Sequence, residues 1–244
     1  MAVFERGRIS LYYETHGDGF PILLFAPGGM RSAASFWARS PWNPIEALSS
    51  RFRVIAMDQR NAGRSRAPIG ERDGWRDYTD DHVALLDHLR VDRCHLLGGC
   101  IGGSYCLGFI ARAPERVASA VLQQPIGLSD ANRQAFYEMF DGWARDLGAK
   151  DPSILAETWT RFRETMYGGD FVFSATREAV AKIDTPMLVL MGNDLYHPEE
   201  TSREIARLAP RAELIERWKD AESIPATVAR VTEFLTRHTP ARLR

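Results

Sequence analysis

From about residue 21 onward, short apolar runs rich in β-branched residues alternate with segments of helical periodicity. Parallel strands need long crossover connections, and helices usually supply them, so this alternation indicates a mostly parallel sheet covered by helices. The predicted strands cover residues 2–5, 9–15, 22–26, 53–58, 94–98, 118–123, 187–191 and 213–217. The clearest helical patterns cover residues 78–89, 102–113, 198–208 and 226–238. The pattern therefore predicts an α/β fold with an eight-stranded sheet, an antiparallel hairpin at its start and helices on both faces.

Residues 128–182 interrupt this alternation with amphipathic helical segments that are rich in aromatic residues. We predict a core made of residues 1–127 and 183–244, with residues 128–182 inserted as a small helical cap. Aromatic residues at helical spacing are more often core than ligand contacts. A cap above the edge of a sheet would nevertheless supply walls for a pocket.

Composition excludes several classes of protein. With 244 residues, 45% of them apolar, the chain is long enough to bury a core without disulfides or metals. A formal net charge of -1 with no basic block argues against nucleic-acid and anionic-membrane partners and favours a small-molecule substrate. Glu5 and Arg6 stand where a secretory signal needs apolar residues, and no apolar stretch is long enough for a membrane span, so we expect a cytoplasmic protein. A homodimer stays an open alternative.

One cysteine stands in a motif that carries chemistry. Cys94, Cys100 and Cys106 fit neither a disulfide framework nor a zinc site. Residues 96–104 read L-L-G-G-C-I-G-G-S, which is a G-x-C-x-G sequence between a predicted strand and a predicted helix. The flanking glycines allow the tight strand-to-helix turn of a nucleophile elbow, and the dipole of the helix N-terminus favours a thiolate. Inert packing of Cys100 is the alternative, and G-x-G-x-x-G of a dinucleotide site is not matched.

Four segments in this order make the chain resemble proteins of the α/β-hydrolase fold. Besides the elbow, A-P-G-G-M at 26–30 follows the third strand, where that family has its oxyanion loop. D-Q-R-N-A-G-R-S at 58–65 is similar to the family segment D-x-R-G-x-G-x-S, with Asn61 in place of the first glycine. G-N-D at 192–194 follows the seventh strand, where the family acid is expected. Dienelactone hydrolases and polyhydroxyalkanoate synthases are members with cysteine in the elbow, so the resemblance is compatible with acyl transfer.

The resemblance implies roles for particular residues. Cys100 would be the nucleophile and Asp194 the acid. The backbone N–H groups of Ile101 and of Gly29 or Met30 would form the oxyanion hole, although a plain Pro-Gly-Gly turn is the alternative for the latter.

The histidine of such a triad is missing from its usual place. Residues 213–225, after the last predicted strand, contain no histidine, and Trp218 or a neighbour stands there instead. Among the six histidines, only His197 falls in a loop at the carboxyl edge of the predicted sheet. We therefore predict His197 as the base, with Asp194 either orienting it or paired with Arg60. A surface histidine at a helix N-terminus is the alternative.

These residues predict a cofactor-free hydrolase that cleaves an ester, lactone or thioester through an acyl-enzyme on Cys100. An acyltransferase is one alternative, because G-x-C-x-G-G resembles the G-x-S-x-G-G of homoserine acetyltransferases. A lyase or a ligand-binding protein with a degenerate triad is another. Cys100, His197 and Asp194 also suit zinc by type, but no pair has a familiar spacing, and we expect no metal.

The substrate itself is not identified by the sequence. Four side chains are expected to contact it, although arginines are more often solvated at the surface. They are Phe36, Trp37, Arg60 and Trp143.

Overall fold

A computed structural model describes residues 2–241. Its eight strands form one sheet in the order β1-β2-β4-β3-β5-β6-β7-β8. The strands are β1 (Ala2–Arg6), β2 (Ile9–His16), β3 (Phe20–Phe25), β4 (Phe52–Met57), β5 (Cys94–Gly99), β6 (Val117–Gln123), β7 (Met187–Leu190) and β8 (Ala212–Ile215). β2 runs antiparallel to β1 and β4, and all other neighbours are parallel. The predicted eight-stranded, mostly parallel sheet is confirmed.

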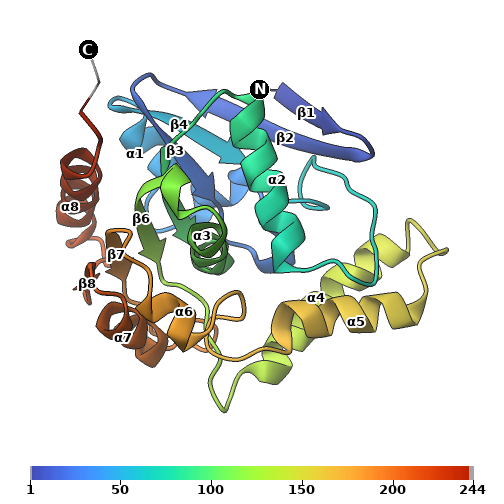
Figure 1. Cartoon of the computed structure of the whole chain (residues 1–244). Coiled ribbons are helices and arrows are strands. Elements are labelled where there is room, and N and C mark those ends of the chain that lie inside the picture. Colours follow the sequence, from blue (N-terminus) through green and yellow to red (C-terminus); the bar gives the residue numbers. More distant parts are fainter. Residues whose placement is uncertain (1, 242–244) are drawn as a thin grey trace.

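Helices cover both faces of this sheet (Figure 1). They are α1 (Pro44–Leu48), α2 (Trp75–His88), α3 (Ile101–Arg112), α4 (Arg133–Gly148), α5 (Ala156–Tyr167), α6 (Arg177–Ala181), α7 (Glu199–Leu208) and α8 (Ile224–Arg237). The described residues also contain three short 3-10 helices, η1 (Gly29–Arg31), η2 (Ala34–Arg39) and η3 (Pro114–Arg116). No helix within residues 2–241 is both long and apolar enough to cross a membrane.

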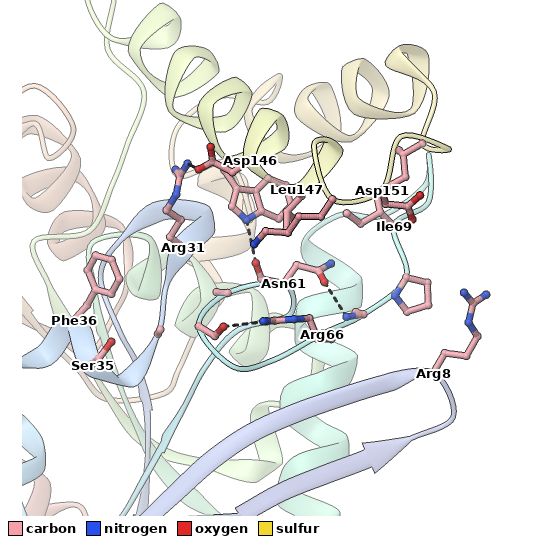
Figure 2. A pocket seen from close by; sticks show the side chains of 18 residues that line it. Arg8, Arg31, Ser35, Phe36, Asn61, Arg66, Ile69, Asp146, Leu147 and Asp151 are labelled. Carbon is pink, nitrogen blue, oxygen red and sulfur yellow. Dashed lines mark hydrogen bonds and ion pairs between the residues drawn. The ribbon is translucent and has the colours of Figure 1, made fainter.

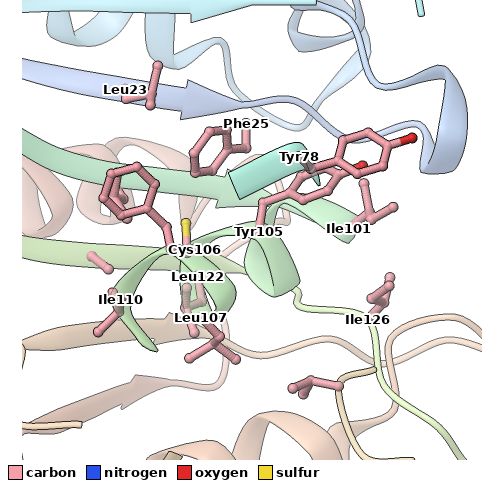
Figure 3. Close-up of a cluster of buried hydrophobic side chains, with 14 of the residues drawn as sticks. Leu23, Phe25, Tyr78, Ile101, Tyr105, Cys106, Leu107, Ile110, Leu122 and Ile126 are labelled. Carbon is pink, nitrogen blue, oxygen red and sulfur yellow. The ribbon is translucent and has the colours of Figure 1, made fainter. Parts of the chain in front are cut away.

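The central strands are buried on both sides because their side chains alternate between two clusters. In β3, Leu23 and Phe25 pack with α2 and α3, whereas Ile22 and Leu24 pack with α1 and α8. Figure 3 shows part of the first cluster, where Tyr105 of α3 lies beside Phe25 of β3. This two-sided packing holds the carboxyl end of β5, and the residue that follows it, in a fixed place.

The segment between β6 and β7 is helical, as the sequence predicts. α4 and α5 pack against each other, and Figure 1 shows the two helices side by side at one side of the molecule. Their aromatic residues are mostly buried and stack edge to face, as Phe140 does with Trp143 and Phe162. α4 also contacts η1, which follows β3. The inserted helices thus lie against the loop at the carboxyl end of a central strand.

Candidate active site

Cys100 lies at a sharp turn between β5 and α3. Its backbone has φ 58° and ψ -120°, a conformation that costs on the order of 1–3 kcal/mol in a non-glycine residue. A Cβ on Gly98 would lie 2.0 Å from the carbonyl oxygen of Gly102, and one on Gly102 would lie 2.2 Å from that of Phe25. Both glycines are therefore needed for the turn, which directs the Cys100 side chain to the carboxyl edge of the sheet.

The thiol opens into a small apolar cavity of about 160 Å³. The cavity takes residues from the loop after β3, the elbow, the loop after β6, α4, α5 and the loop after β7. Its lining consists of Gly28, Gly29, Cys100, Ile101, Ile126, Phe136, Met139, Tyr167, Tyr196 and His197. An apolar cavity of roughly 150 Å³ accommodates benzene, so this one is suited to a small acyl group.

The loop after β7 brings His197 and Asp194 together. His197 Nδ1 lies 2.7 Å from Asp194 Oδ1, which also accepts the backbone N–H groups of Tyr196 and His197 at 3.0 and 3.1 Å. His197 is only 8% exposed, and its Nε2 makes no close hydrogen bond with another described residue. Asp194 thus fixes the ring with Nδ1 as the donor, so that Nε2 is available to the thiol. The alternative pairing of Asp194 with Arg60 is wrong, because the Arg60 guanidinium is held by Asp81.

The thiol and the imidazole shift each other's protonation. Burial raises the pKa of Cys100, but the attraction of His197 and the backbone N–H groups of Gly28 and Ile101 together bring it below its ordinary value. Burial lowers the pKa of His197, but Cys100 and Asp194 outweigh this effect and raise it to about 9. The pair therefore favours the thiolate of Cys100 more than an isolated cysteine does, and the thiolate is the reactive form of a cysteine nucleophile.

Alkylation of Cys100 by iodoacetamide is expected to follow this pKa. In the native protein, the rate should rise with pH through a midpoint below the ordinary thiol value, since the thiolate is the reactive form. In His197→Ala the attraction of the imidazole is gone, so the midpoint should rise above that of the native protein. Intact mass measured against pH gives both midpoints, and Cys100→Ala controls for Cys94 and Cys106, which are buried. Equal midpoints in the native and His197→Ala proteins would contradict this coupling.

The position of His197 depends on a glycine at the start of its loop. A Cβ on Gly192 would lie 2.4 Å from both the Cβ and the backbone oxygen of His197. Gly192→Ala is therefore expected to displace the imidazole and to lower ester turnover by about 100-fold, the effect of a shift of roughly 1 Å. Gly142→Ala is the matched control, because nothing lies within 4 Å of the added methyl. Unchanged turnover in Gly192→Ala would show that the imidazole is not used.

Glycines of the loop after β3 line the cavity together with Cys100 and Ile101. The backbone N–H groups of Gly28 and Ile101 lower the pKa of the Cys100 thiol, and the oxyanion donors expected from the sequence, Ile101 with Gly29 or Met30, stay a prediction. Gly29 lines the cavity, and Met30 is buried in the core. Gly28 and Gly29 have φ values of 121° and 57°, which glycine adopts without strain.

The side chains expected to contact substrate lie outside this cavity. Phe36 and Trp143 line a separate pocket of about 650 Å³. Trp37 is 1% exposed and packs beside Gly99, and Arg60 is buried, with its Nε donating to Asp81 at 2.8 Å. The cavity-lining residues that this expectation missed are Ile126, Phe136, Met139, Tyr167 and Tyr196. The spacing of Phe136 and Met139, three residues apart on one helical face, was the available signal.

Trp218 occupies the region where the family histidine was expected. Its side chain is 1% exposed, and its Nε1 donates to the backbone oxygen of Met191 at 2.7 Å. The indole therefore joins the loops after β7 and β8 within the core instead of reaching the cavity. Among residues 2–241, no three His, Cys, Asp or Glu side chains are placed to hold a metal ion.

Comparisons with known proteins bear on the family and fold of this chain. A family profile described as alpha/beta hydrolase fold matches residues 21–176. The "Putative carbamate hydrolase RutD" of Azorhizobium caulinodans is 40% identical over 122 residues, which cover 50% of this chain and 43% of the relative. The RutD protein of Variovorax paradoxus is 40% identical over 114 residues, 46% of this chain and 41% of the relative. The matches thus span less than half the length of these curated relatives.

Solved structures resemble nearly the whole chain. The enol-lactonase from Burkholderia xenovorans LB400 has a TM-score of 0.72 at 23% identity, covering 96% of this chain and 100% of that one. The meta-cleavage product hydrolase from Pseudomonas fluorescens IP01 has a TM-score of 0.69 at 21% identity, covering 95% and 96%. Together with the profile match and the eight-stranded sheet, they show that the chain belongs to the alpha/beta hydrolase fold family.

Proposed function

We propose that this protein is a cofactor-free hydrolase that cleaves small esters, lactones or thioesters through an acyl-enzyme on Cys100. The observation that carries the proposal is the convergence on one cavity of the Cys100 thiol, the His197–Asp194 pair and the N–H groups of Gly28 and Ile101. The name carbamate hydrolase, given to the RutD relatives, supports a hydrolytic reaction and adds carbamates to the candidate substrates.

In the first half of the reaction, the Cys100 thiolate attacks the substrate carbonyl carbon. The carbonyl electron pair moves to its oxygen, and the N–H groups of Gly28 and Ile101 stabilise the resulting oxyanion, each by about 3 kcal/mol. When the intermediate collapses, the bond to the leaving group breaks and His197 Nε2 gives that group its proton. The product of this half is a thioester on Cys100.

In the second half, water replaces the leaving group. His197, now neutral, takes a proton from the water through Nε2 while the oxygen attacks the thioester carbonyl. The same two N–H groups hold the oxyanion, and the acid is released as the Cys100 thiolate leaves. Asp194 keeps Nδ1 protonated throughout and stabilises the imidazolium.

The inserted helices limit the size of the acyl group. Phe136 and Met139 of α4 and Tyr167 of α5 form one side of the cavity, and we propose residues 128–182 as a cap over the core. kcat/KM is expected to be at least about tenfold higher for p-nitrophenyl butyrate than for the octanoate, because a cavity of about 160 Å³ holds only a benzene-sized group. Met139→Ala should narrow that difference by lengthening the cavity.

The ester series also tests the function as a whole. Release of p-nitrophenol is measured for acetate, butyrate and octanoate with the native protein and with Cys100→Ala. Hydrolysis of the short esters that disappears in the variant supports a cysteine hydrolase. Release no faster than in Cys100→Ala for any ester would overturn the proposal. A higher rate with octanoate than with butyrate would contradict only the assigned acyl cavity.

A further inference from the structure

The larger pocket, of about 650 Å³, lies beside the candidate active site but does not include Cys100 (Figure 2). One face of α4 lines both the cavity and the pocket, since Phe136 and Met139 line the catalytic cavity while Trp143 and Leu147 line the larger pocket. Met139 and Trp143 are four residues apart, which places the cavity and the pocket about 6 Å apart along α4. The volume of the larger pocket falls in the range of sites for small organic molecules.

An unpaired donor lies in the wall of this pocket. Asn61 is 8% exposed and has φ 58°, a conformation that asparagine tolerates better than most residues. Its Oδ1 accepts the backbone N–H of Ala67 at 2.8 Å, which fixes the orientation of the amide (Figure 2). The amide Nδ2 is buried and has no hydrogen-bond partner among the described residues. A buried N–H group without an acceptor is destabilising, so this position suits a ligand oxygen.

The charges around the pocket also favour a ligand with anionic oxygen atoms. Its lining has four cationic side chains, Arg8, Arg31, Arg66 and Lys150, against the carboxylates of Asp146 and Asp151. Arg31 is paired with Asp146, and Asp151 accepts hydrogen bonds from Ser153 in its own turn. Within residues 2–241, no hydrogen bond or ion pair is formed by the Arg8 guanidinium or the Lys150 ammonium. An excess of positive charge therefore remains available to a ligand.

The remaining walls are apolar and come from Phe36, Ile69, Leu147 and Ile154. We propose that this pocket binds an organic anion that has an apolar body and one carboxylate or phosphate group, with its anionic oxygen at Asn61 Nδ2 and Lys150. The site is distinct from the catalytic cavity, and the proposal does not depend on the hydrolytic function. Phe36 lies between the pocket and the cavity. It lines the pocket, and its ring lies 3.1 Å from the position that a Cβ on Gly28, a residue of the cavity, would take.

The test is a calorimetric titration of the native protein with three probes of similar shape. They are 4-phenylbutyrate, its neutral analogue 4-phenylbutyramide and 3-phenylpropyl phosphate. The carboxylate is expected to bind at least tenfold more tightly than the amide, and added salt should weaken it because the cations are partly exposed. Binding of the phosphate but not the carboxylate would also support an anion site and would assign phosphate as its ligand. Equal affinity for acid and amide, or no binding of any probe, would overturn the proposal.

Variants then locate the bound anion. Asn61→Gly keeps the positive φ, since glycine adopts it freely, and should raise Kd about fivefold. Lys150→Gln, at an exposed position in the turn after α4, should have a similar effect without disturbing the Asn61 loop. Lys182→Gln lies outside the pocket and is the matched control, for which Kd should not change. Binding that is insensitive to both pocket variants, or that is lost when Cys100 is carboxamidomethylated, would place the ligand elsewhere and overturn the proposal.

Discussion

Replacement of Cys100 by alanine is expected to lower kcat for p-nitrophenyl butyrate by at least about 1000-fold, because loss of the nucleophile removes the covalent route and leaves only binding and the oxyanion donors. The proposed donors are backbone N–H groups, those of Gly28 and Ile101, and they remain in the variant. Steady-state release of p-nitrophenol measures the effect.

Cys106→Ala provides the control for this prediction. Cys106 is a buried cysteine in α3, the helix that follows Cys100, and it does not line the cavity. Its removal should therefore leave kcat within a few-fold of the native value. Ester hydrolysis by Cys100→Ala at the native rate would mean that another group performs the reaction.

His197→Ala is expected to stop the reaction after its first half. The acyl group can still be transferred to the sulfur, more slowly because the thiol pKa rises, but no group within the cavity then activates water. Steady-state turnover should fall by at least about 1000-fold, in line with the loss of a catalytic base. Rapid mixing should still show one equivalent of p-nitrophenol per protein.

His16→Ala is the matched histidine substitution, since His16 belongs to β2 and lies outside the cavity. Its burst and its turnover should both resemble those of the native protein. Native-like turnover in His197→Ala would remove the imidazole from the mechanism.

Much of this architecture follows from local sequence patterns. Short continuous runs of β-branched and other apolar residues identified the strands, because the side chains on both faces of a central strand are buried and must be apolar. The elbow was evident from the sequence because the tight turn at Cys100 leaves no room for a Cβ at position 98 or 102, and both positions are glycine. The end of the last strand was less clear, since β8 stops at Ile215 and Trp218 then turns into the core.

Other features depended on contacts between distant segments. Arg60 could not be placed from its sequence, because it is drawn into a buried ion pair with Asp81, which α2 supplies. The sequence does not distinguish Gly28 from Gly29 as an oxyanion donor, because two adjacent glycines allow the loop after β3 to turn in either way. His197 was reached by elimination among the histidines, but its hydrogen bond to Asp194 required the close turn that Gly192 permits.

In the proposed mechanism, Cys100 carries the acyl group between the two half-reactions. The most direct test is an intact-mass time course with p-nitrophenyl butyrate, followed by peptide mapping of the modified protein. We expect a transient butyryl adduct on Cys100, formed as fast as the burst of p-nitrophenol and lost at the steady-state rate. Turnover without an adduct on Cys100, or with the adduct on another residue, would contradict this mechanism.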